Sequence, residues 1–357
     1  MKRFPAEKLK KFAEAILQAA GSSRGEAEIV ADHLVQSNLA GHDSHGIGML
    51  PTYVSSIEKG ALVPNVEMQP VLDHGAMMVF DGRRGYGQRL AREAMAAAIE
   101  RCRDNGLVFM GLRNAHHMGR IGSYGEQAIE AGLVSLHFVN VVDHRPLVAP
   151  CRGTAARYST NPICFAMPAT AGSAPILLDM ATSKVALGKM RVAMNKGEEV
   201  AAEILYDGCG QPTTDPSVMF VEPYGAITSL GQHKGYGIAF FCELLAGVLT
   251  GGGTIQPENP QMGGIINHMA TIIIDPQRLV DYQWMEQEIT ALVKYVKSAP
   301  AEDPELPVLV AGEPETMTRS ERCSSGIPVD ATTCEQLFAS ARLVGIERHH
   351  AEVLLCS

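Results

Sequence analysis

The feature of this sequence that most constrains its fold is a change of hydrophobic period along the chain. Apolar residues recur at helical spacing near the N-terminus, and this spacing returns near Glu286. From about residue 75 the chain instead contains short apolar runs bounded by glycine, proline or aspartate, such as AMMVFDG, GLVFMGL and ATIIIDP. Such runs are typical of buried strands, and helical stretches separate some of them. The pattern predicts an α/β or α+β protein with a sheet of about six or seven strands.

Helical sequence brackets this sheet-containing centre. Near the N-terminus, Ser23 and Glu26 form a capping-box pattern that starts a helix running to about Leu39. The tail from Ala331 to Leu355 also has helical spacing. We therefore predict that the two ends of the chain pack together. The predicted helical domain comprises residues 1–72 with 284–357, and the predicted sheet-containing domain comprises residues 73–283.

The formal net charge of −9 and the scattered cysteines limit the expected partners and location. An acidic chain without a basic patch is not expected to bind nucleic acid or anionic membranes. No apolar run reaches the length of a membrane span, and charged residues interrupt the N-terminal region where a signal peptide would need an apolar stretch. The eight cysteines form no CxxC pair, which favours reduced thiols. We predict a cytoplasmic protein with neither a nucleic-acid nor a membrane partner.

The stretch NAHHMGRIGSYGEQA, residues 114–128, joins an apolar strand to a helix through glycines. Its spacing differs from the GxGxxG fingerprint of classical dinucleotide-binding proteins, which this sequence lacks. Free N–H groups at the start of such a helix can still bind a phosphate, and Arg120 adds a positive charge. The alternative is an ordinary strand–turn–helix connection.

The stretch AGHDSHGIGMLPTYV, residues 40–54, places His45 beside Asp43 and Ser44, just after a predicted helix. A histidine with a pKa near neutrality can move the proton of a hydroxyl group, and a neighbouring serine or aspartate can orient its ring. The alternative is an Asx-type turn that carries a solvated histidine.

Three further stretches combine polar residues with a turn or a helix start. In ILLDMATSKVALGK a buried strand ends at Asp179, whose carboxylate can orient a histidine, accept a hydrogen bond from a ribose hydroxyl or cap the following segment. In GQHKGYG, His233 and Lys234 stand among glycines, which suits a phosphate, a ribose or a plain helix start. The stretch LVAGEPE carries two carboxylates and on composition is only a turn.

The adjacent histidines His116 and His117 raise the question of a metal site. Neighbouring residues of an extended chain point to opposite sides, so both rings do not easily bind one ion. The sequence contains no HExxH or EF-hand pattern and no paired cysteines, and it lacks the GxSxG elbow of serine hydrolases. We predict no metal site.

Taken in order, these motifs resemble one family along essentially the whole chain. The motifs are DSHGIGMLPTYV, RNAHHMGRIGSYGEQA, STNPICFAMPA, LLDMATSKVALGKMRVAMNKGE, GQPTTDP, LGQHKGYG, ELLAGVLTGG and VAGEPE. The chain resembles the malate/L-lactate dehydrogenase family of the non-Rossmann type, and within it most closely the hydroxycarboxylate dehydrogenase branch. Ureidoglycolate, sulfolactate and 2,3-diketogulonate oxidoreductases and the reductases of cyclic imino acids belong to the same family.

The resemblance implies reversible hydride transfer between NAD(H) or NADP(H) and a small 2-hydroxy or 2-keto acid. It implies a mixed, non-Rossmann nucleotide-binding sheet, which accounts for the missing fingerprint. It also implies a homodimer with the active site between the sheet and helical domains. Two alternatives are a reductase of cyclic imino acids such as pyrroline-2-carboxylate and a nucleotide-binding relative without catalysis.

Carried over by position, the resemblance assigns catalytic roles to His117, His45, Ser44 and Asp179. Either His117 or His45 removes the hydroxyl proton, and His117 matches the family's proposed proton-transfer histidine. The expected cofactor contacts are His45, Gly119, Arg120, Ile121, Leu177, Leu178, Asp179, Met180, Ala181, His233, Lys234, Asn267, Gly312, Glu313, Pro314 and Glu315. The expected substrate contacts are Met49, Asn140 and Thr160, with Asn161 beside them.

One position departs from the family pattern. Many relatives carry an arginine four residues after the DSHG histidine, where it grips the substrate carboxylate, whereas this chain has Met49. A bidentate cation is thus replaced by an apolar thioether. Either another cation binds the carboxylate, with Arg113, Arg120 and Arg145 as candidates, or the substrate carries a bulkier apolar group beside Met49.

Overall fold

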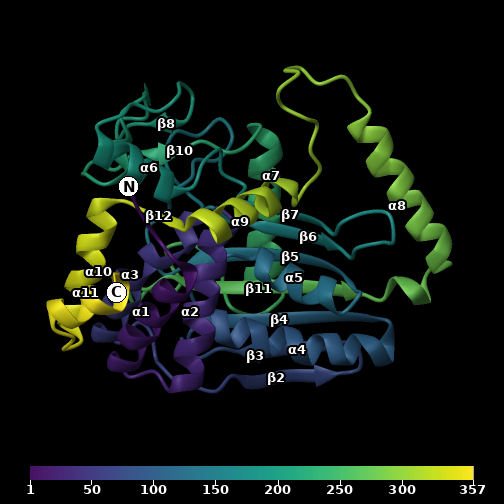
Figure 1. The fold of residues 1–357 in the computed structure, drawn as a ribbon, viewed down its shortest axis with the longest axis horizontal. Coiled ribbons are helices and arrows are strands. Elements are labelled where there is room, and N and C mark those ends of the chain that lie inside the picture. Colours follow the sequence, from purple (N-terminus) through teal and green to yellow (C-terminus); the bar gives the residue numbers. More distant parts are fainter. Residues whose placement is uncertain (357) are drawn as a thin grey trace.

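The computed structural model describes residues 1–356, apart from the side chains of residues 195 and 356. A seven-stranded mixed sheet forms its centre (Figure 1). Only the pair β3–β4 is parallel, and the other neighbouring strands run antiparallel. The sheet confirms the mixed α/β class and the strand number expected from the sequence. In spatial order its strands are β2 (Gln69–His74), β3 (Met77–Asp81), β4 (Leu107–His116), β11 (Ile266–Ile274), β5 (Val134–Val142), β6 (Ile163–Met167) and β7 (Ile176–Met180).

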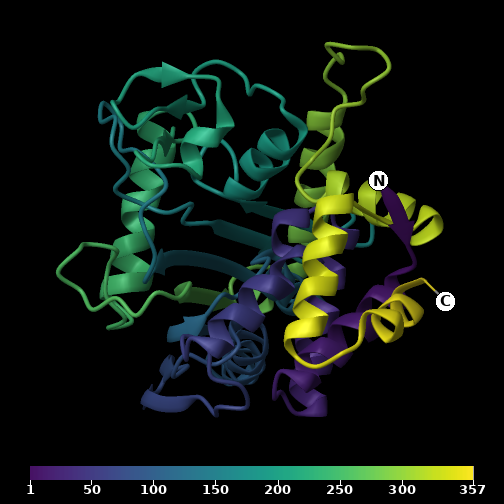
Figure 2. The same ribbon diagram turned by 90° about the vertical axis from the view of Figure 1, so that its left-hand side faces the viewer.

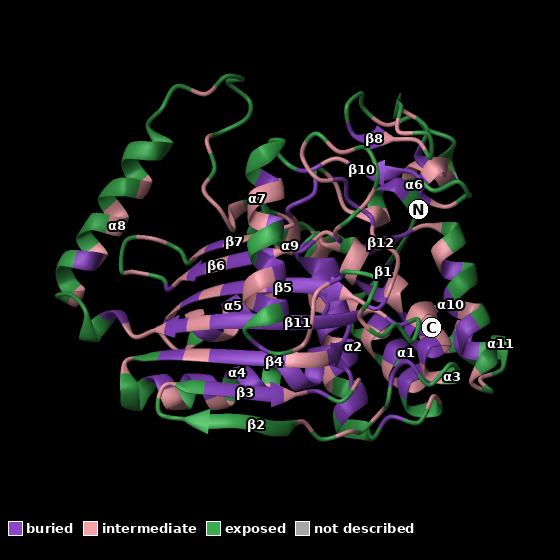
Figure 3. Cartoon of the chain, turned by 180° about the vertical axis from the view of Figure 1, so that it is seen from behind, coloured by how far each residue is buried: buried purple, intermediate pink, exposed green. Residues whose placement is uncertain are grey.

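Helices cover both faces of this sheet. Helices α4 (Gly87–Asn105) and α5 (Gly122–Glu130) lie on the face that Figure 1 shows in front, where they bury an apolar core against β4, β6 and β11. The view from behind in Figure 3 shows α7 (His233–Cys242) in front of the other face. Helix α7 continues into the π-helical segment η4 (Glu243–Val248), which packs on β5 and β11.

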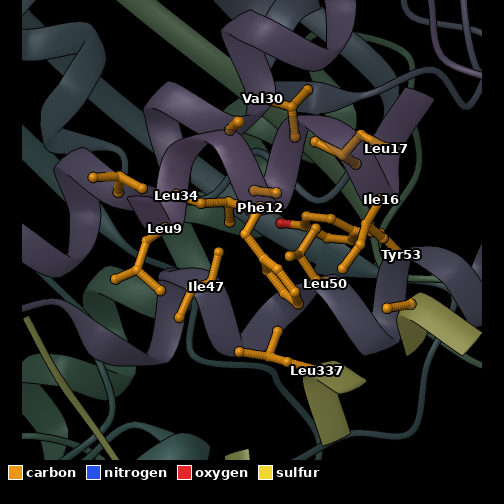
Figure 4. Packing of buried hydrophobic residues seen from close by; sticks show 14 of the residues in the cluster. Leu9, Phe12, Ile16, Leu17, Val30, Leu34, Ile47, Leu50, Tyr53 and Leu337 are labelled. Carbon is orange, nitrogen blue, oxygen red and sulfur yellow. The ribbon is translucent and has the colours of Figure 1, made fainter. Parts of the chain in front are cut away.

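The two ends of the chain share a second apolar core. Periodic apolar residues on α1 (Ala6–Ala19), including Phe12 and Ile16, are fully buried against helices from both ends (Figure 4). The N- and C-terminal helices accordingly lie side by side in Figure 2. The other elements of this helical unit are α2 (Arg24–Leu39), α3 (Leu50–Glu58), α10 (Ala331–Leu343), α11 (Arg348–Cys356) and the short strand pair β1 (Lys2–Phe4) with β12 (Ile327–Val329).

Helix α8 (Tyr282–Lys297) stands apart from this helical unit, as Figures 1 and 3 show, although the expected domain division places residues 284–297 within it. Its contacts reach instead to the turn after β6, where the backbone N–H of Ala171 donates to Glu286 over 3.1 Å. Met285 is the buried residue of α8. The chain returns to the helical unit through α9 (Glu313–Ser325), which packs on α2.

A smaller lobe with its own apolar core sits beyond β7, and short connecting elements complete the fold. None of the helices in residues 1–356 is both long and apolar enough to cross a membrane. The lobe contains α6 (Leu187–Lys196), β8 (Leu205–Tyr206), β9 (Pro212–Thr213), η3 (Pro216–Met219) and β10 (Ala226–Ile227), and the connecting elements are η1 (Asp43–His45), η2 (Ile47–Met49) and η5 (Pro276–Arg278).

Candidate active site

The structure brings His45 and His117 into direct contact where the helical unit meets the sheet. His45 ends the short helix η1, and His117 is the first residue after β4. Nδ1 of His45 lies 3.3 Å from Nε2 of His117, and the two rings are nearly parallel, with an interplanar angle of 17°. His45 is partly exposed and His117 is buried. Residues that are 72 positions apart thus form one hydrogen-bonded pair.

The backbone after β4 is held so that the His117 ring points towards the helical unit. The backbone N–H of Met118 donates to Oδ1 of Asn267 on β11 over 2.8 Å. Gly119 then has φ +72°, and a Cβ there would lie 2.3 Å from Nε2 of His33 on α2. Both the left-handed conformation and the close approach of the imidazole require glycine at this position. The glycine turn therefore serves the packing of the two units.

A buried hydrogen-bonded chain continues inward from His117. The hydroxyl of Tyr53 on α3 lies 2.8 Å from Nδ1 of His117, and Nε2 of Gln88 at the start of α4 donates to that hydroxyl over 2.6 Å. Tyr53 and Gln88 are 0% and 1% exposed. The start of α4 reaches this place because Gly87 packs against the end of β4, where a Cβ would lie 2.1 Å from the carbonyl oxygen of His116. We call Gln88, Tyr53, His117 and His45 the neutral chain.

The histidines of the neutral chain are held uncharged. Burial, with smaller effects from the His42 and Arg120 charges, lowers the pKa of His45 to about 4. Burial also lowers the pKa of His117 well below its ordinary value, and the neighbouring His45 and His116 add to this. Burial raises the pKa of the Tyr53 phenol. At neutral pH the chain therefore consists of hydrogen-bond donors and acceptors without net charge.

His116, the first histidine of the doublet, differs from its neighbour. It is 0% exposed, and neither of its ring nitrogens has a hydrogen-bond partner among the residues described. Burial lowers its pKa to about 3, and its ring packs edge-on against Tyr53 with centroids 5.9 Å apart. His116 thus contributes packing behind the neutral chain.

A charged network lies beside the neutral chain at the start of α5. Nη1 of the buried Arg120 donates to Glu126 over 2.8 Å, and its Nε lies 3.6 Å from Oδ2 of Asp179. The same Asp179 oxygen accepts the backbone N–H of Gly122 over 2.7 Å. We call Arg120, Glu126, Asp179 and the Gly122 N–H the ionic cluster. Burial alone would lower the pKa of Arg120, but the two carboxylates outweigh it and raise that pKa.

The ionic cluster bears on two alternatives that the sequence leaves open. Asp179, which could orient a histidine, accept from a ribose hydroxyl or cap a segment, accepts the N–H of Gly122, while Tyr53 contacts the His117 ring. The start of α5, which could bind a phosphate or be an ordinary strand–turn–helix connection, has its Gly122 N–H bonded to this carboxylate. The sequence missed both contacts because the partners come from strands and helices distant along the chain.

The neutral chain and the ionic cluster share one neighbourhood. Both His45 and Asp179 experience the charges of His42 and Arg120. Nε2 of His42 in turn lies 3.4 Å from Oε1 of Glu315 on α9. Ser44 faces the start of α6, where a Cβ on Gly188 would lie 2.8 Å from the Ser44 Cβ.

Three of the segments expected to contact a dinucleotide adjoin one another. Leu177 on β7 donates its N–H to the carbonyl of Ala311 over 3.2 Å, which places β7 beside Gly312–Glu315. The N–H of Leu230 donates to the carbonyl of Thr182 over 2.9 Å, which places the end of β7 beside the start of α7. His233 and Lys234 are exposed there. The backbone N–H groups of Lys234 and Gly235 already donate to the carbonyls of Gly231 and Leu230, so this place offers an anion the Lys234 side chain rather than an open helix start.

The expected substrate contacts have varied surroundings. Met49 packs at the edge of the helical core. The carbonyl of Thr160 accepts the N–H and the hydroxyl of Thr182, so Thr160 lies next to Ala181. Asn140 is buried and donates to Glu243 over 3.0 Å, and Asn161 donates to the other oxygen of the same carboxylate over 2.8 Å. The polar atoms of these two asparagines thus support the π-helical segment η4.

The three arginines considered as replacements for the missing cation are engaged elsewhere. Arg113 pairs with Asp81 at 2.9 Å, and Arg145 stacks on the Tyr224 ring at 4.1 Å. Arg120 belongs to the ionic cluster. A cavity of about 480 Å³ lies against α3. It is lined by Pro51, Thr52, Ser55, Ser56, Lys59, Asp143, His144, Gly263, Gly264 and Ile265.

Three residues of this site carried no signal in the sequence: Tyr53, Gln88 and His33. Tyr53 stands within the LPTYV motif but at a position that helical spacing assigns to a core, and His33 and Gln88 are polar residues within helices. Their contacts distinguish them: Tyr53 bonds to the His117 ring, Gln88 donates to Tyr53, and Nε2 of His33 accepts the backbone N–H of Arg120. Among residues 1–356, no three His, Cys, Asp or Glu side chains are grouped closely enough to hold a metal ion.

Comparisons with known proteins agree with this architecture. The family model for malate/L-lactate dehydrogenase matches residues 4–338. The hydroxycarboxylate dehydrogenase B of Escherichia coli K12 is 44% identical over 96% of this chain and 95% of its own length. The L-lactate dehydrogenase of Cupriavidus necator is 42% identical over 87% of this chain and 89% of its own.

Solved structures extend the likeness to the whole fold. The malate dehydrogenase of Pyrococcus horikoshii superposes with a TM-score of 0.84 at 31% identity and covers 97% of this chain and 96% of its own. The Δ1-piperideine-2-carboxylate reductase of Pseudomonas syringae superposes with a TM-score of 0.82 at 27% identity, over 96% of this chain and all of its own. The chain therefore belongs to the malate/L-lactate dehydrogenase family and is an oxidoreductase that acts on a CH–OH group.

Proposed function

We propose that this enzyme transfers a hydride reversibly between the nicotinamide of NAD(H) or NADP(H) and C2 of a small 2-hydroxy or 2-keto acid. The observation that carries the proposal is the hydrogen-bonded pair of His45 and His117, in a chain 44% identical to a hydroxycarboxylate dehydrogenase. Removing a hydride from a hydroxy acid also releases the hydroxyl proton, which needs a base. Two adjoining imidazoles provide that base and can return the same proton in the reverse direction.

The pair gains and loses one proton relative to its uncharged state. In oxidation, the substrate hydroxyl gives its proton to a ring nitrogen of the pair, and the second imidazole accepts a hydrogen bond from the imidazolium. In reduction, the same N–H returns the proton to the oxygen on C2. Because burial lowers the pKa values of both rings, the resting pair is uncharged at neutral pH. The nicotinamide, when bound, supplies or takes the hydride, and the protein supplies orientation and the proton.

Ser44 and Asp179 keep supporting roles in this proposal. The Ser44 hydroxyl, next to His45, donates a hydrogen bond to the developing oxyanion. Asp179 acts through the ionic cluster, because its carboxylate fixes Arg120 and the start of α5 behind the site. The presence of Ser44, His45 and His117 together argues against a relative that binds nucleotide without catalysis.

The residues present fit a dinucleotide on one observation: the exposed cation Lys234 stands in the first turn of α7. Its ammonium matches the charge of a pyrophosphate. His233 stands beside Lys234, and the adjoining β7 and α9 segments supply backbone groups. In this proposal the further dinucleotide contacts are His45, Gly119, Ile121, Leu177, Leu178, Met180, Ala181, Asn267, Gly312, Glu313, Pro314 and Glu315.

We propose that the substrate carries an apolar group beside Met49. Arg113 and Arg145 are paired with other groups and Arg120 is buried in the ionic cluster, so none of these three candidates replaces the missing arginine. A thioether offers contact to a methyl or larger alkyl group but no bidentate hydrogen bond. Keto acids with an apolar side chain should therefore be reduced with a higher kcat/KM than oxaloacetate.

The experiment that tests the function is a substrate panel run with both dinucleotides. The enzyme is mixed with NADH or NADPH and with pyruvate, 2-ketobutyrate, phenylpyruvate, oxaloacetate or pyrroline-2-carboxylate, and the absorbance at 340 nm is followed. The proposal expects a fall in absorbance with at least one keto acid. A response to pyrroline-2-carboxylate alone would assign the enzyme to the cyclic imino acid reductases, and no response to any compound would contradict a dehydrogenase function.

We also propose that the enzyme is a homodimer, as its family resemblance implies. Helix α8 supports this, because it carries the exposed apolar side chains Trp284, Leu292 and Tyr295 and buries little of its surface within one chain. Multi-angle light scattering should give twice the chain mass of 38.3 kDa. A Tyr295→Asp substitution should shift the mass towards the monomer. A wild-type mass of one chain at micromolar concentration would contradict the proposal.

A further inference from the structure

We propose that Gln88 and Tyr53 are positioning residues that support both protonation states of the His117–His45 pair. This inference rests on the proposed function, because it concerns the pair that moves the substrate proton. Neither Gln88 nor Tyr53 belongs to the residues that the family resemblance assigns. They act through His117, from the side of the ring opposite His45.

The geometry defines the direction of the hydrogen bonds in the neutral chain. The amide nitrogen of Gln88 can only donate, so the Tyr53 oxygen accepts that bond. The Tyr53 hydrogen then points to Nδ1 of His117, since the recorded partners of the Tyr53 hydroxyl are His117 and Gln88. His117 consequently carries its hydrogen on Nε2 and donates to Nδ1 of His45. The structure thus corresponds to the uncharged pair, with the hydrogen of His45 on Nε2. The pair accepts a substrate proton at that nitrogen once the direction of the bonds in the neutral chain is reversed.

A proton on His117 requires the opposite direction. Nδ1 then carries a hydrogen and donates to the Tyr53 oxygen, so that the Tyr53 hydroxyl needs an acceptor of its own. The buried amide oxygen of Gln88 has no partner among the described residues. Rotating the amide by half a turn brings this oxygen to the Tyr53 hydroxyl and gives that hydroxyl an acceptor. A glutamine suits this place because it offers one donor and one acceptor at the same reach.

The surroundings leave this role to Gln88. The titratable side chains that act on His117 include no carboxylate that could pair with an imidazolium; they are His45 from η1, His33 from α2, Tyr53 from α3, His116 from β4 and His144 after β5. His42 and Arg120 act on His45, the other member of the pair, and both lower its pKa.

Two substitutions of nearly equal size at residue 88 give opposite expected results. Gln88→Glu supplies an acceptor, which stabilises the protonated pair and raises its pKa. Gln88→Met removes both donor and acceptor, which leaves the Tyr53 hydroxyl unpaired when His117 is protonated and lowers that pKa. A buried hydrogen bond of about 1–2 kcal/mol corresponds to a shift of about one pH unit in each direction.

The experiment measures the apparent pKa in two ways. One readout is the acidic limb of the pH profile of kcat/KM for hydroxy acid oxidation. The other is ¹⁵N NMR of the enzyme without substrate, labelled only in histidine, in which the His117 signals are identified by their loss in His117→Asn. Wild type should show His117 with Nε2 protonated and Nδ1 bare. Gln127→Glu, the same change on α5 where the side chain contacts the Arg92 carbonyl, should leave both readouts unchanged.

The outcomes separate the two proposals. Opposite shifts for Gln88→Glu and Gln88→Met, with folding verified by circular dichroism, support the inference. Shifts of the same sign, or none, overturn it while leaving the role of His117 intact. Full turnover in His117→Ala would instead overturn the proposed function of the pair, whatever the result at Gln88. If Gln88→Glu fails to fold, Tyr53→Phe provides the second test, and an unchanged ¹⁵N tautomer of His117 in that variant overturns the inference.

Discussion

The neutral chain and the ionic cluster both adjoin the turn after β4, but their buried polar groups are paired in different ways. The neutral chain links Gln88, Tyr53, His117 and His45 through hydrogen bonds of 2.6, 2.8 and 3.3 Å without a net charge. The ionic cluster balances one buried guanidinium against two carboxylates. Uncharged imidazoles can gain and lose a proton at modest cost, whereas a paired buried charge is fixed because removing either partner is costly. The comparison assigns proton movement to the first network and rigidity to the second.

The largest expected effect comes from breaking the neutral chain at its centre. Replacing His117 by alanine should lower turnover by about 10²- to 10⁴-fold, because a positioned acid–base group is lost. The affinity for the dinucleotide should stay nearly unchanged, since the expected dinucleotide contacts lie mainly along β7, α7 and α9. Steady-state kinetics and fluorescence titration of the reduced dinucleotide check this. Equal losses in turnover and affinity would count against the separation of the two networks.

Breaking the ionic cluster should instead lower stability. Asp179→Leu leaves the buried Arg120 with Glu126 alone and removes the acceptor for the Gly122 N–H. We expect a loss of about 3 kcal/mol in the free energy of unfolding, which urea denaturation measures. The double variant Arg120→Met with Asp179→Leu should recover much of this loss, because the uncompensated charge is gone. If Asp179→Leu instead abolished turnover at unchanged stability, Asp179 would act on the histidines directly.

The ionic cluster also affects where the phosphates of the dinucleotide can bind. Since Asp179 already occupies the start of α5, we expect the phosphates of the dinucleotide to bind beside the exposed Lys234 on α7. Lys234→Ala should raise the Kd of the dinucleotide about tenfold, which corresponds to about 1.4 kcal/mol, with little change in kcat. Isothermal titration calorimetry at two salt concentrations measures the effect. An unchanged Kd at low salt would place the phosphates elsewhere.

The smallest expected effect is on the pH dependence of folding stability. It tests whether His116, unlike His117, affects stability but not turnover. Burial lowers the pKa of His116 to about 3, below that of the unfolded chain near 6.5, so the unfolded state binds more protons between these values. Stability should therefore be fully present above about pH 6.5 and fall as the pH drops towards 3. His116→Leu should reduce this slope by about 1.4 kcal/mol per pH unit and leave turnover nearly intact.

Urea denaturation at several pH values between 5 and 8 measures that slope. Asp179 of the ionic cluster changes the stability with pH in the opposite sense. Burial raises its pKa above 3.8, so its contribution to stability is lost as the pH rises through its pKa in the folded state. An unchanged slope in His116→Leu would show that His116 is not held neutral by burial.

The sequence predicts the sheet and the helical core well, because each depends on local pattern. Apolar runs bounded by turn residues correspond to strands β3, β4, β6, β7 and β11, and helical spacing predicts the buried face of α1. Helical spacing also predicts the helix α8 but not its neighbours in the fold, since an amphipathic period shows that one face is apolar but not what covers it.

The site is less predictable because its contacts are long-range. The doublet and the DSHG motif identify His117 and His45, but the Tyr53–Gln88 pair depends on α4 approaching the end of β4 at Gly87. The glycine turn predicts an open helix start at α5, and only the fold brings in Asp179, 57 residues later, to occupy it. Motifs thus locate single residues, while their hydrogen-bond partners follow from the packing of whole elements.

The central claim is that the enzyme moves a hydride from C2 of a hydroxy acid while the histidine pair takes the hydroxyl proton. Its most direct test is a single turnover of wild type and His117→Ala with a hydroxy acid deuterated at C2, followed by mass spectrometry of the dinucleotide. We expect the wild-type product to carry one deuterium and the His117→Ala variant to bind the dinucleotide but form almost none of this product. Deuterium released to water, or equal product from both proteins, would contradict the claim.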